Sequence, residues 1–267
     1  MMATAEGRYE VKLGHLSTLT GTPTHYCAGC EHGTLTRLIA SALEEMGLRE
    51  RTVMVDSVGC SVFAHDYINV DAIQSPHGRA PAVMAGIKRL RPDLTVFAVQ
   101  GDGDAVSIGL LELVNAAVRG EPITVFLVNN AIYGMTGGQM APTTPVGMVT
   151  TTSPRGRDRA LTGPPIDASK LIGGLEGPAY VKRVLLPVTP TPTPEVFNAK
   201  GALEGAKAVR NAFRVQQMGG FAFVEFISTC SVNWKMSILE SKRYATEVLA
   251  KIFPPGLYKD TLGVESR

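Results

Sequence analysis

The chain has 267 residues, of which 45% are hydrophobic and 19% charged, and its formal net charge is +2. This composition fits a globular domain with a sizeable core, and the near-neutral charge argues against a protein that binds nucleic acid mainly by electrostatics. No apolar run approaches the roughly 18 residues of a membrane span, and the first residues lack the apolar segment of a signal peptide. We therefore expect a cytoplasmic protein with no membrane span and no nucleic-acid partner.

Apolar runs and amphipathic segments alternate along the chain. After an N-terminal arm at residues 1–24, the pattern predicts helices near residues 35–46, 79–90, 106–119, 166–172 and 201–218, and strands at residues 52–56, 94–100, 123–128, 180–185 and 221–227. This alternation predicts one α/β domain over residues 25–233, built on an open, mainly parallel sheet with helices on both faces. The third of these helices is expected to bury a stripe of Ile108, Leu111, Val114 and Ala117.

Two segments lack such a pattern. Residues 136–164 are rich in Gly, Thr and Pro, and a loop of this length inside a compact domain usually serves a site or an interface. Residues 234–267 form a polar, mildly helical tail, which we expect to be peripheral and to contact another subunit.

Polar turns follow three of the predicted strands. These turns are Gly59-Cys60, Gly101-Asp102-Gly103 and Asn129-Asn130, and the carboxyl ends of parallel strands meet at the edge of a sheet where ligands bind. The glycines allow a close approach of backbone to phosphate, and the following helix offers its first N–H groups to an anion. Carboxylate and amide oxygens suit Mg²⁺ with a diphosphate. Ordinary turns without a ligand are the simpler alternative.

The four cysteines are Cys27, Cys30, Cys60 and Cys230. In a reducing compartment disulfides are not expected, and a Cys-x-x-Cys pair indicates metal binding or redox chemistry. A structural zinc site and a [4Fe–4S] cluster both use four thiolates. One close pair with two distant single cysteines fits a cluster held between separate loops better than zinc, which usually takes two close pairs.

The string NNAIYGMTGGQMAPTT, together with the upstream GDG, resembles the β subunit of 2-oxoacid:ferredoxin oxidoreductases in the 2-oxoisovalerate, 2-oxoglutarate and aromatic 2-oxoacid branch. The cysteine contexts CAGC, GCS and CSVNW are similar to those of the same family. They depart from its usual CPGCGHG and CPTNW strings, and one departure places Glu31 beside the cysteine pair.

The resemblance implies roles for particular residues. Mg²⁺ would be held by Asp102, Asn130 and the carbonyl of Ile132, and the [4Fe–4S] cluster by Cys27, Cys30, Cys60 and Cys230. His77 and Thr136 would be catalytic. The thiamine diphosphate site would comprise Gly59, Cys60, Ser61, His77, Gly78, Gly101, Asp102, Gly103, Asp104, Ala105, Asn130, Ile132, Tyr133, Gly134, Met135 and Thr136.

The same resemblance implies a reaction and partners. The reaction is oxidative decarboxylation of a 2-oxo acid with coenzyme A, giving acyl-CoA and CO₂ and passing electrons to ferredoxin. An α subunit would share the active site and supply a glutamate and the coenzyme A site, with γ and ferredoxin-like subunits completing the complex. Two alternatives remain: a thiamine-dependent decarboxylase without redox chemistry, and a zinc-stabilised interaction subunit without catalysis.

Overall fold

The computed structural model describes residues 2–3, 9–10, 16–187, 189–190, 197–198 and 200–266. Much of the arm expected at residues 1–24 therefore lies outside the described residues. Two short antiparallel pairs stand apart from the main sheet: β1 (Met2–Ala3) with β2 (Tyr9–Glu10), and β10 (Thr189–Pro190) with β11 (Phe197–Asn198).

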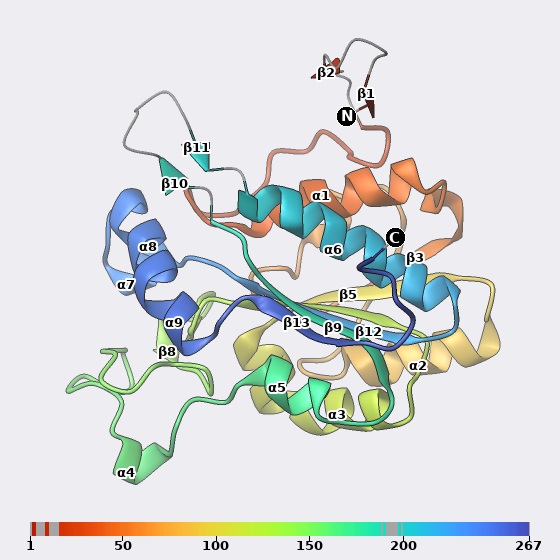
Figure 1. The fold of residues 1–267 in the computed structure, drawn as a ribbon. Helices are drawn as coiled ribbons and strands as arrows, with labels where there is room; N and C mark the ends of the chain where they lie inside the picture. Colours follow the sequence, from red (N-terminus) through yellow and green to blue (C-terminus); the bar gives the residue numbers. More distant parts are fainter. Residues whose placement is uncertain are drawn as a thin grey trace.

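Seven strands form the central sheet of the described chain, in the order β13-β9-β12-β6-β5-β3-β4 (Figure 1). All neighbouring pairs are parallel except the one between β13 and β9. The strands are β3 (Thr52–Asp56), β4 (Asp71–Gln74), β5 (Thr95–Gly101), β6 (Thr124–Asn129), β9 (Pro178–Leu185), β12 (Phe221–Ile227) and β13 (Gly256–Asp260). The expected α/β class with a mainly parallel sheet is confirmed.

Helices cover both faces of the sheet (Figure 1). One face carries α1 (His32–Glu45) and α6 (Lys200–Gln217), and the other carries α2 (Ala80–Leu90), α3 (Leu110–Val118) and α5 (Ala168–Gly173). Short elements complete the fold: η1 (Arg49–Arg51), η2 (Ala64–Asp66), η3 (Asp104–Ile108), β7 (Ile132–Tyr133), β8 (Gln139–Met140), α4 (Arg159–Thr162), α7 (Ser231–Trp234), α8 (Ile238–Tyr244), η4 (Ala245–Leu249) and α9 (Ala250–Ile252).

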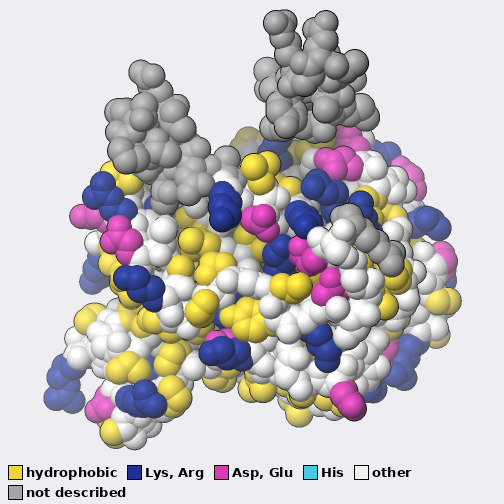
Figure 2. Space-filling model, viewed as in Figure 1, with side chains coloured by type: hydrophobic (Ala, Val, Ile, Leu, Met, Phe, Trp, Pro, Cys, Tyr) yellow, Lys and Arg dark blue, Asp and Glu magenta, His cyan; other side chains and the backbone are white. Residues whose placement is uncertain are grey.

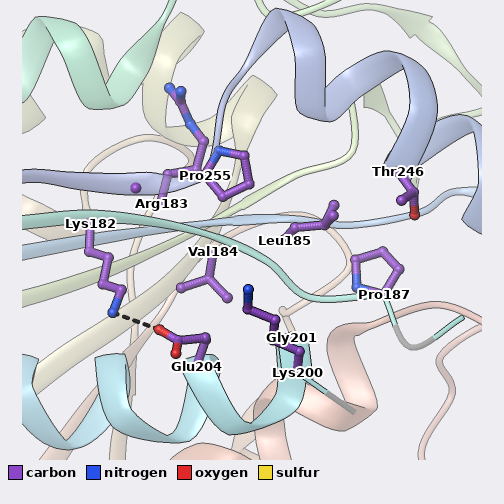
Figure 3. A pocket seen from close by; sticks show the side chains of 11 residues that line it. Lys182, Arg183, Val184, Leu185, Pro187, Lys200, Gly201, Glu204, Thr246 and Pro255 are labelled. Carbon is purple, nitrogen blue, oxygen red and sulfur yellow. Dashed lines mark hydrogen bonds and ion pairs between the residues drawn. The ribbon is translucent and has the colours of Figure 1, made fainter. Parts of the chain in front are cut away.

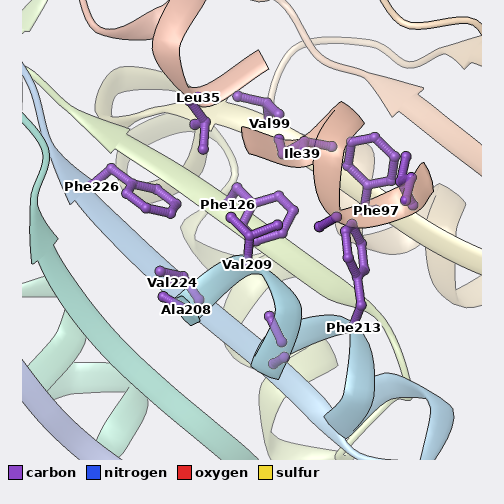
Figure 4. Packing of buried hydrophobic residues seen from close by; sticks show 14 of the residues in the cluster. Leu35, Ile39, Phe97, Val99, Phe126, Ala208, Val209, Phe213, Val224 and Phe226 are labelled. Carbon is purple, nitrogen blue, oxygen red and sulfur yellow. The ribbon is translucent and has the colours of Figure 1, made fainter. Parts of the chain in front are cut away.

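An aromatic cluster fills the layer between the sheet and the α1–α6 face (Figure 4). Phe97 of β5, Phe126 of β6 and Phe213 of α6 are fully buried, with ring centroids 5.5 to 6.0 Å apart. Edge-to-face contacts of this kind add to the free energy gained from burying the rings. The central strands are therefore held rigidly, and their carboxyl ends form a fixed platform.

The helix predicted at residues 106–119 is interrupted. One turn of π-helix, η3, runs from Asp104 to Ile108, Gly109 follows it, and α3 begins at Leu110. The extra residue in the turn rotates the following side chains, so Leu113 is fully buried whereas Ile108 and Leu111 are 43% and 68% exposed. The predicted apolar stripe is therefore wrong for Ile108 and Leu111.

Two strands of the sheet were not foreseen. Strand β4 is an edge strand with every residue exposed, and its sequence DAIQ has no apolar run. Strand β13 comes from the tail, which therefore adds an antiparallel edge to the sheet. The helices α7 to α9 pack Trp234, Leu249 and Phe253 against Ala131 and Ile132 of the turn after β6. The tail thus contacts a segment that carries predicted site residues.

Charges of both signs are interspersed on the face seen in Figure 2, with no continuous field of one sign. Among the described residues, no helix is long and apolar enough to cross a membrane.

Candidate active site

A hollow of about 100 Å³ lies at the carboxyl ends of β3, β5 and β6. The parallel strands β4 and β5 lie on opposite sides of β3, so the order in which strands are added to the sheet reverses here, and open α/β sheets bind ligands at such a point. The lining residues are His32, Val58, Gly59, Cys60, His77, Gly101, Asp102, Gly103, Asp104, Asn130, Ile132, Tyr133, Gly134, Met135 and Thr136. Three separated turns predicted from sequence thus surround one space.

Three residues of the predicted thiamine diphosphate site do not line this hollow. The Ser61 hydroxyl donates to the Val99 carbonyl oxygen at 2.7 Å, Gly78 donates its N–H to Asp104, and Ala105 is fully buried in the core. The lining residue Val58 was missed, because an apolar residue in a turn gives no chemical signal.

Asp102 is buried at the base of the hollow. Its carboxylate accepts hydrogen bonds from the Gly103 amide at 2.9 Å and from the Thr143 hydroxyl. Burial raises the pKa of Asp102 to about 7, and hydrogen bonds from Thr143 and neighbouring amides, including that of Ala131, offset this only in part. A carboxylate held in this way favours a bound cation, because a cation stabilises its charged form.

Asp104 lines the hollow, and its carboxylate also holds neighbouring segments in place. Its carboxylate accepts hydrogen bonds from Ser57, His77 Nδ1, Gln100 and the Gly78 amide, the last at 2.7 Å. It therefore fixes His77 and the loop before α2 rather than pointing freely to a ligand. A carboxylate acceptor at Nδ1 keeps the proton there, so the neutral ring presents Nε2 as its acceptor.

The turn after β6 has a backbone conformation that alanine rarely adopts. Ala131 lies between Asn130 and Ile132 with φ of 60°, in the left-handed region. The Asn130 side-chain oxygen accepts the Ile132 N–H at 3.3 Å, and the Asn130 carbonyl accepts from Trp234 Nε1 at 3.1 Å. These contacts hold the Asn130 side chain and the Ile132 backbone at the hollow.

The long loop at residues 136–164 contributes directly to this arrangement. Thr143 donates to Asp102, and the Thr144 hydroxyl donates to the Ala131 carbonyl at 2.6 Å. Arg157 is 5% exposed, and its guanidinium donates to five backbone carbonyls: those of Ala141, Pro142, Thr144, Thr162 and Pro164. Sequence reasoning missed these three residues, since the loop has no period from which to infer contacts.

Glycines allow two close approaches in the site. A Cβ on Gly103 would lie 2.2 Å from the Tyr133 ring, whose hydroxyl donates to the Gly103 carbonyl at 3.2 Å. A Cβ on Gly134 would lie 3.2 Å from Cys60 Sγ, 3.7 Å from Cys230 Sγ and 3.5 Å from the Asn130 amide nitrogen. The two thiols and the Asn130 side chain therefore all lie near this one position.

All four cysteines are free thiols, Cys60 lines the hollow, and the other three lie near enough to it or to one another to influence a neighbouring thiol's pKa. Burial raises the pKa of Cys30 to about 12 and that of Cys60 to about 11, with smaller contributions from the other thiols of the group. Asn233 donates to Cys230 Sγ at 3.2 Å, and His32 Nδ1 lies 3.0 Å from Cys30 Sγ. Burial also lowers the pKa of His32 to about 4, so its ring is neutral.

Glu31 is buried beside the cysteine pair and forms an ion pair with Lys242 of α8 at 2.7 Å. The carboxylate therefore does not stand alone near the thiols, and the pair ties the tail to this loop.

Within the described residues, no three His, Cys, Asp or Glu side chains converge closely enough to hold one metal ion. A cubane cluster needs its four thiolates spread around a larger group. Asp102, Asn130 and the carbonyl of Ile132 fit Mg²⁺ by type, because all three offer oxygen ligands and one of them is a carboxylate.

Met135 and Thr136 lie at the rim. Met135 is 51% exposed, and the Thr136 hydroxyl donates to Gln139 at 2.6 Å. Arg79, at the start of α2, forms an ion pair with Glu112 of α3.

A larger hollow of about 430 Å³ lies between β9, α6 and the segment before β13 (Figure 3). It includes none of the predicted site residues. Its Lys182 ammonium is already paired with Glu204 at 3.1 Å and with Glu265 at 2.8 Å. Size alone therefore does not identify the candidate site.

Comparison with known proteins agrees with this geometry. The family described as thiamine pyrophosphate enzyme, C-terminal TPP binding domain, matches residues 57–226. The chain is thus a TPP-binding α/β domain of that class. It is 35% identical over 225 residues to the 2-oxoglutarate synthase subunit KorB of Archaeoglobus fulgidus, covering 84% of this chain and 76% of the relative. The chain belongs to the family of 2-oxoacid oxidoreductase subunits, which confirms the resemblance inferred from its motifs.

A ketoisovalerate oxidoreductase subunit, VorA of Methanothermobacter thermautotrophicus, is 45% identical over 240 residues. The match covers 90% of this chain but 48% of the relative, so the chain spans about half the length of that protein. The structure is also similar to a 2-oxoglutarate:ferredoxin oxidoreductase from Magnetococcus marinus, with a TM-score of 0.73 and 24% identity over 91% of this chain and 84% of that one. This likeness supports the fold.

Proposed function

We propose that the chain is the thiamine-diphosphate-binding catalytic subunit of a complex that oxidatively decarboxylates a 2-oxo acid to acyl-CoA and CO₂. The observation that carries this proposal is at Gly134, where Cys60 Sγ, Cys230 Sγ and the Asn130 amide nitrogen all lie within 4 Å of the position that a Cβ would take. The proposed metal turn and the proposed ligands of an iron–sulfur cluster are thus neighbours.

Asp102, Asn130 and the Ile132 carbonyl would hold Mg²⁺, and the backbone of Gly103 and Asp104, which lines the hollow at the start of η3, would bind the diphosphate. Bound thiamine diphosphate supplies the carbon nucleophile and the electron sink that decarboxylation of a 2-oxo acid requires. Gly103 lets this backbone approach Tyr133, which would cover the diphosphate. These residues bind and orient, and they exclude water from the base of the hollow.

His77 would handle protons in this site. Asp104 anchors Nδ1, so Nε2 of the neutral ring is the atom that can accept a proton at the rim and return it. Thr136 lies at the same rim and could contact the substrate by its hydroxyl group once Gln139 releases it.

The four thiols would ligate one [4Fe–4S] cluster, which accepts electrons singly. Burial raises the pKa of Cys30, Cys60 and Cys230, so positive charge from iron would stabilise these thiolates. Ferredoxin or a ferredoxin-like subunit is the proposed receiver, and a cytoplasmic location, with its reducing thiol chemistry, is part of the proposal.

An α subunit would complete the active site with a glutamate and the coenzyme A site, and a γ subunit would complete the complex. We assign the α interface to residues 136–164 and to the tail at residues 234–267. The loop exposes Val146, Val149 and Leu161, the last at 82%. Exposed apolar side chains next to a site are typical of a surface that a partner covers.

The decisive experiment is turnover of the reconstituted complex with coenzyme A and a viologen dye. The substrates are 2-oxoglutarate, 2-oxoisovalerate, pyruvate and phenylglyoxylate. One of them should reduce the dye, and this chain alone should not. Dye reduction by the isolated chain would contradict the shared site, and decarboxylation without dye reduction would favour a non-redox decarboxylase.

Iron and sulfide analysis of Cys60→Ala tests the cluster. The variant should lose visible absorbance and iron but retain Mg²⁺-dependent binding of thiamine diphosphate. Zinc in place of iron in the unmodified protein, with no thiamine bound, would support the interaction-subunit alternative instead.

A further inference from the structure

Ala131 is the most unusual backbone position in the candidate site. Among the described residues, Ala131 and Lys235 are the non-glycine residues with positive φ. Lys235 is exposed, whereas Ala131 is fully buried. The left-handed conformation is unfavourable for a residue with a Cβ and persists only where the surroundings impose it. The surroundings of Ala131 must therefore supply that constraint.

One constraint acts on the Ala131 N–H. This group donates to the side-chain oxygen of Asn129 at 3.1 Å. The amide nitrogen of Asn129 donates in turn to Glu225 at 2.7 Å, and Glu225 forms a fully buried ion pair with Arg183 at 2.8 Å. The orientation of the Asn129 side chain is thus fixed from the neighbouring strands.

A second constraint acts on the Ala131 carbonyl. The Thr144 hydroxyl donates to it at 2.6 Å and accepts the Ala141 N–H at 2.9 Å. The Thr144 carbonyl accepts from Arg157, which holds this part of the long loop through backbone carbonyls alone. The first constraint thus acts on the peptide group before the Ala131 Cα, and the second acts on the peptide group after it.

We propose that Asn129 and Thr144 form a two-sided clamp on Ala131, and that this clamp positions Asn130 and the Ile132 carbonyl for Mg²⁺. The two ligand-bearing residues flank Ala131, so its φ angle determines the direction in which each faces. Asn129 and Thr144 are positioning residues, since they act through the Ala131 backbone. The inference rests on the proposed function, because it assumes Mg²⁺ at this turn.

The test is a Mg²⁺ titration of the full chain with thiamine diphosphate present. Trp234, the one tryptophan of the sequence, donates to the Asn130 carbonyl, so its fluorescence reports on the turn without any turnover. Thr144→Val keeps the shape of the side chain and removes the hydroxyl, and Mg²⁺ affinity should fall about 10- to 100-fold. Thr144→Ser should restore most of it.

The double variant Thr144→Val with Ala131→Gly distinguishes a positioning role of Thr144 from a merely structural one. Glycine adopts positive φ without a clamp, so the double variant should recover Mg²⁺ affinity to within a few-fold of the original. A merely structural role for Thr144 would lower thermal stability, and Ala131→Gly would not restore metal binding. Thr162→Val is the matched control, since its hydroxyl is in the same loop but bonds Asp158.

Unchanged Mg²⁺ affinity in Thr144→Val, or no recovery in the double variant, would overturn the clamp. Should Thr144→Val fail to fold, Asn129→Ala tests the other side by the same titration, with the same rescue expected from Ala131→Gly. If the unmodified chain showed no Mg²⁺-dependent binding of thiamine diphosphate, the proposed function itself would fall. The two failures are therefore distinguishable.

Discussion

Two regions of the central sheet differ in how their buried carboxylates are paired. We call the region at the ends of β3 and β5 the site side, and the region around β9 and β13 the paired side. On the site side, at the ends of β3 and β5, burial raises the pKa of Asp56 to about 6 and that of Asp102 to about 7. On the paired side, around β9 and β13, Glu265 is also partly buried, but hydrogen bonds from Lys182, Tyr180 and Lys207 outweigh burial and lower its pKa to about 2. The paired side neutralises its charges internally, whereas the site side leaves its carboxylates without enough positive charge.

This difference is a better guide to function than cavity size. The larger hollow lies on the paired side, where Lys182 already has two carboxylate partners. The smaller one lies where carboxylates would gain most from a cation. Perturbed carboxylates in a cleft are a general mark of functional sites.

The largest predicted effect on stability comes from removing the buried cation of the paired side. Arg183→Met leaves Glu225 and Asp167 without their cation in the interior, and unfolding free energy should fall by about 3 to 5 kcal/mol. Urea denaturation measures this. Adding Glu225→Gln should recover part of the loss. The surface pair serves as the control, since Arg91→Met should cost less than about 1 kcal/mol.

Next in size is the loss of the carboxylate on the site side. Asp102→Ala should weaken Mg²⁺ and thiamine diphosphate binding by about 100-fold, while the visible absorbance expected from the proposed cluster persists. Calorimetric titration measures the affinity, and Asp66→Ala, on an exposed carboxylate, is the control. Unaltered Mg²⁺ affinity in Asp102→Ala would contradict the assignment of Asp102 as a Mg²⁺ ligand.

A pH experiment on Asp56 sharpens the comparison. Burial raises its pKa despite the contact with His65, so the folded state holds the proton more tightly than the unfolded state does. Its stabilising contribution is complete below about pH 4 and is lost as pH rises through 6, a loss of about 2 to 3 kcal/mol. Asp56→Asn should abolish this part of the pH dependence of urea unfolding, whereas Asp71→Asn should not.

Glu265 should show the opposite and smaller pH dependence. Its lowered pKa means that its contribution is present above about pH 4.5 and is lost as pH falls towards 2. Glu265→Gln should cost about 1 to 2 kcal/mol at pH 7 and almost nothing near pH 2. A cost that did not depend on pH would show that Glu265 acts by packing rather than by charge.

The sequence predicted the sheet class and the turns that line the hollow because both depend on local patterns. Asp102, Asn130 and Cys60 each follow an apolar strand, and parallel strands bring such positions to one edge. Glu225 was missed as a support of the site, although a carboxylate within FAFVEFI indicates a buried partner. Its bond to Asn129 joins residues 96 positions apart, and local pattern does not specify such pairs.

Other features depended on geometry that no residue type reveals. The π-helical turn η3 is followed by Gly109, whose backbone lies so close to that of Gly78 that neither residue has room for a Cβ. Arg157 holds the long loop together because five backbone carbonyls face its guanidinium, and the loop sequence has no period that would predict this. Neither contact has a periodic signature.

Gly134 sets the spacing between the two chemistries proposed for this chain. Cys60 Sγ, Cys230 Sγ and the Asn130 amide nitrogen all lie within 4 Å of the position that a Cβ on residue 134 would take. Any residue other than glycine would therefore put a side chain into the space next to both the proposed cluster ligands and the proposed metal turn. With glycine there, the spacing between the two depends on backbone geometry and does not vary with the rotation of a side chain at this position.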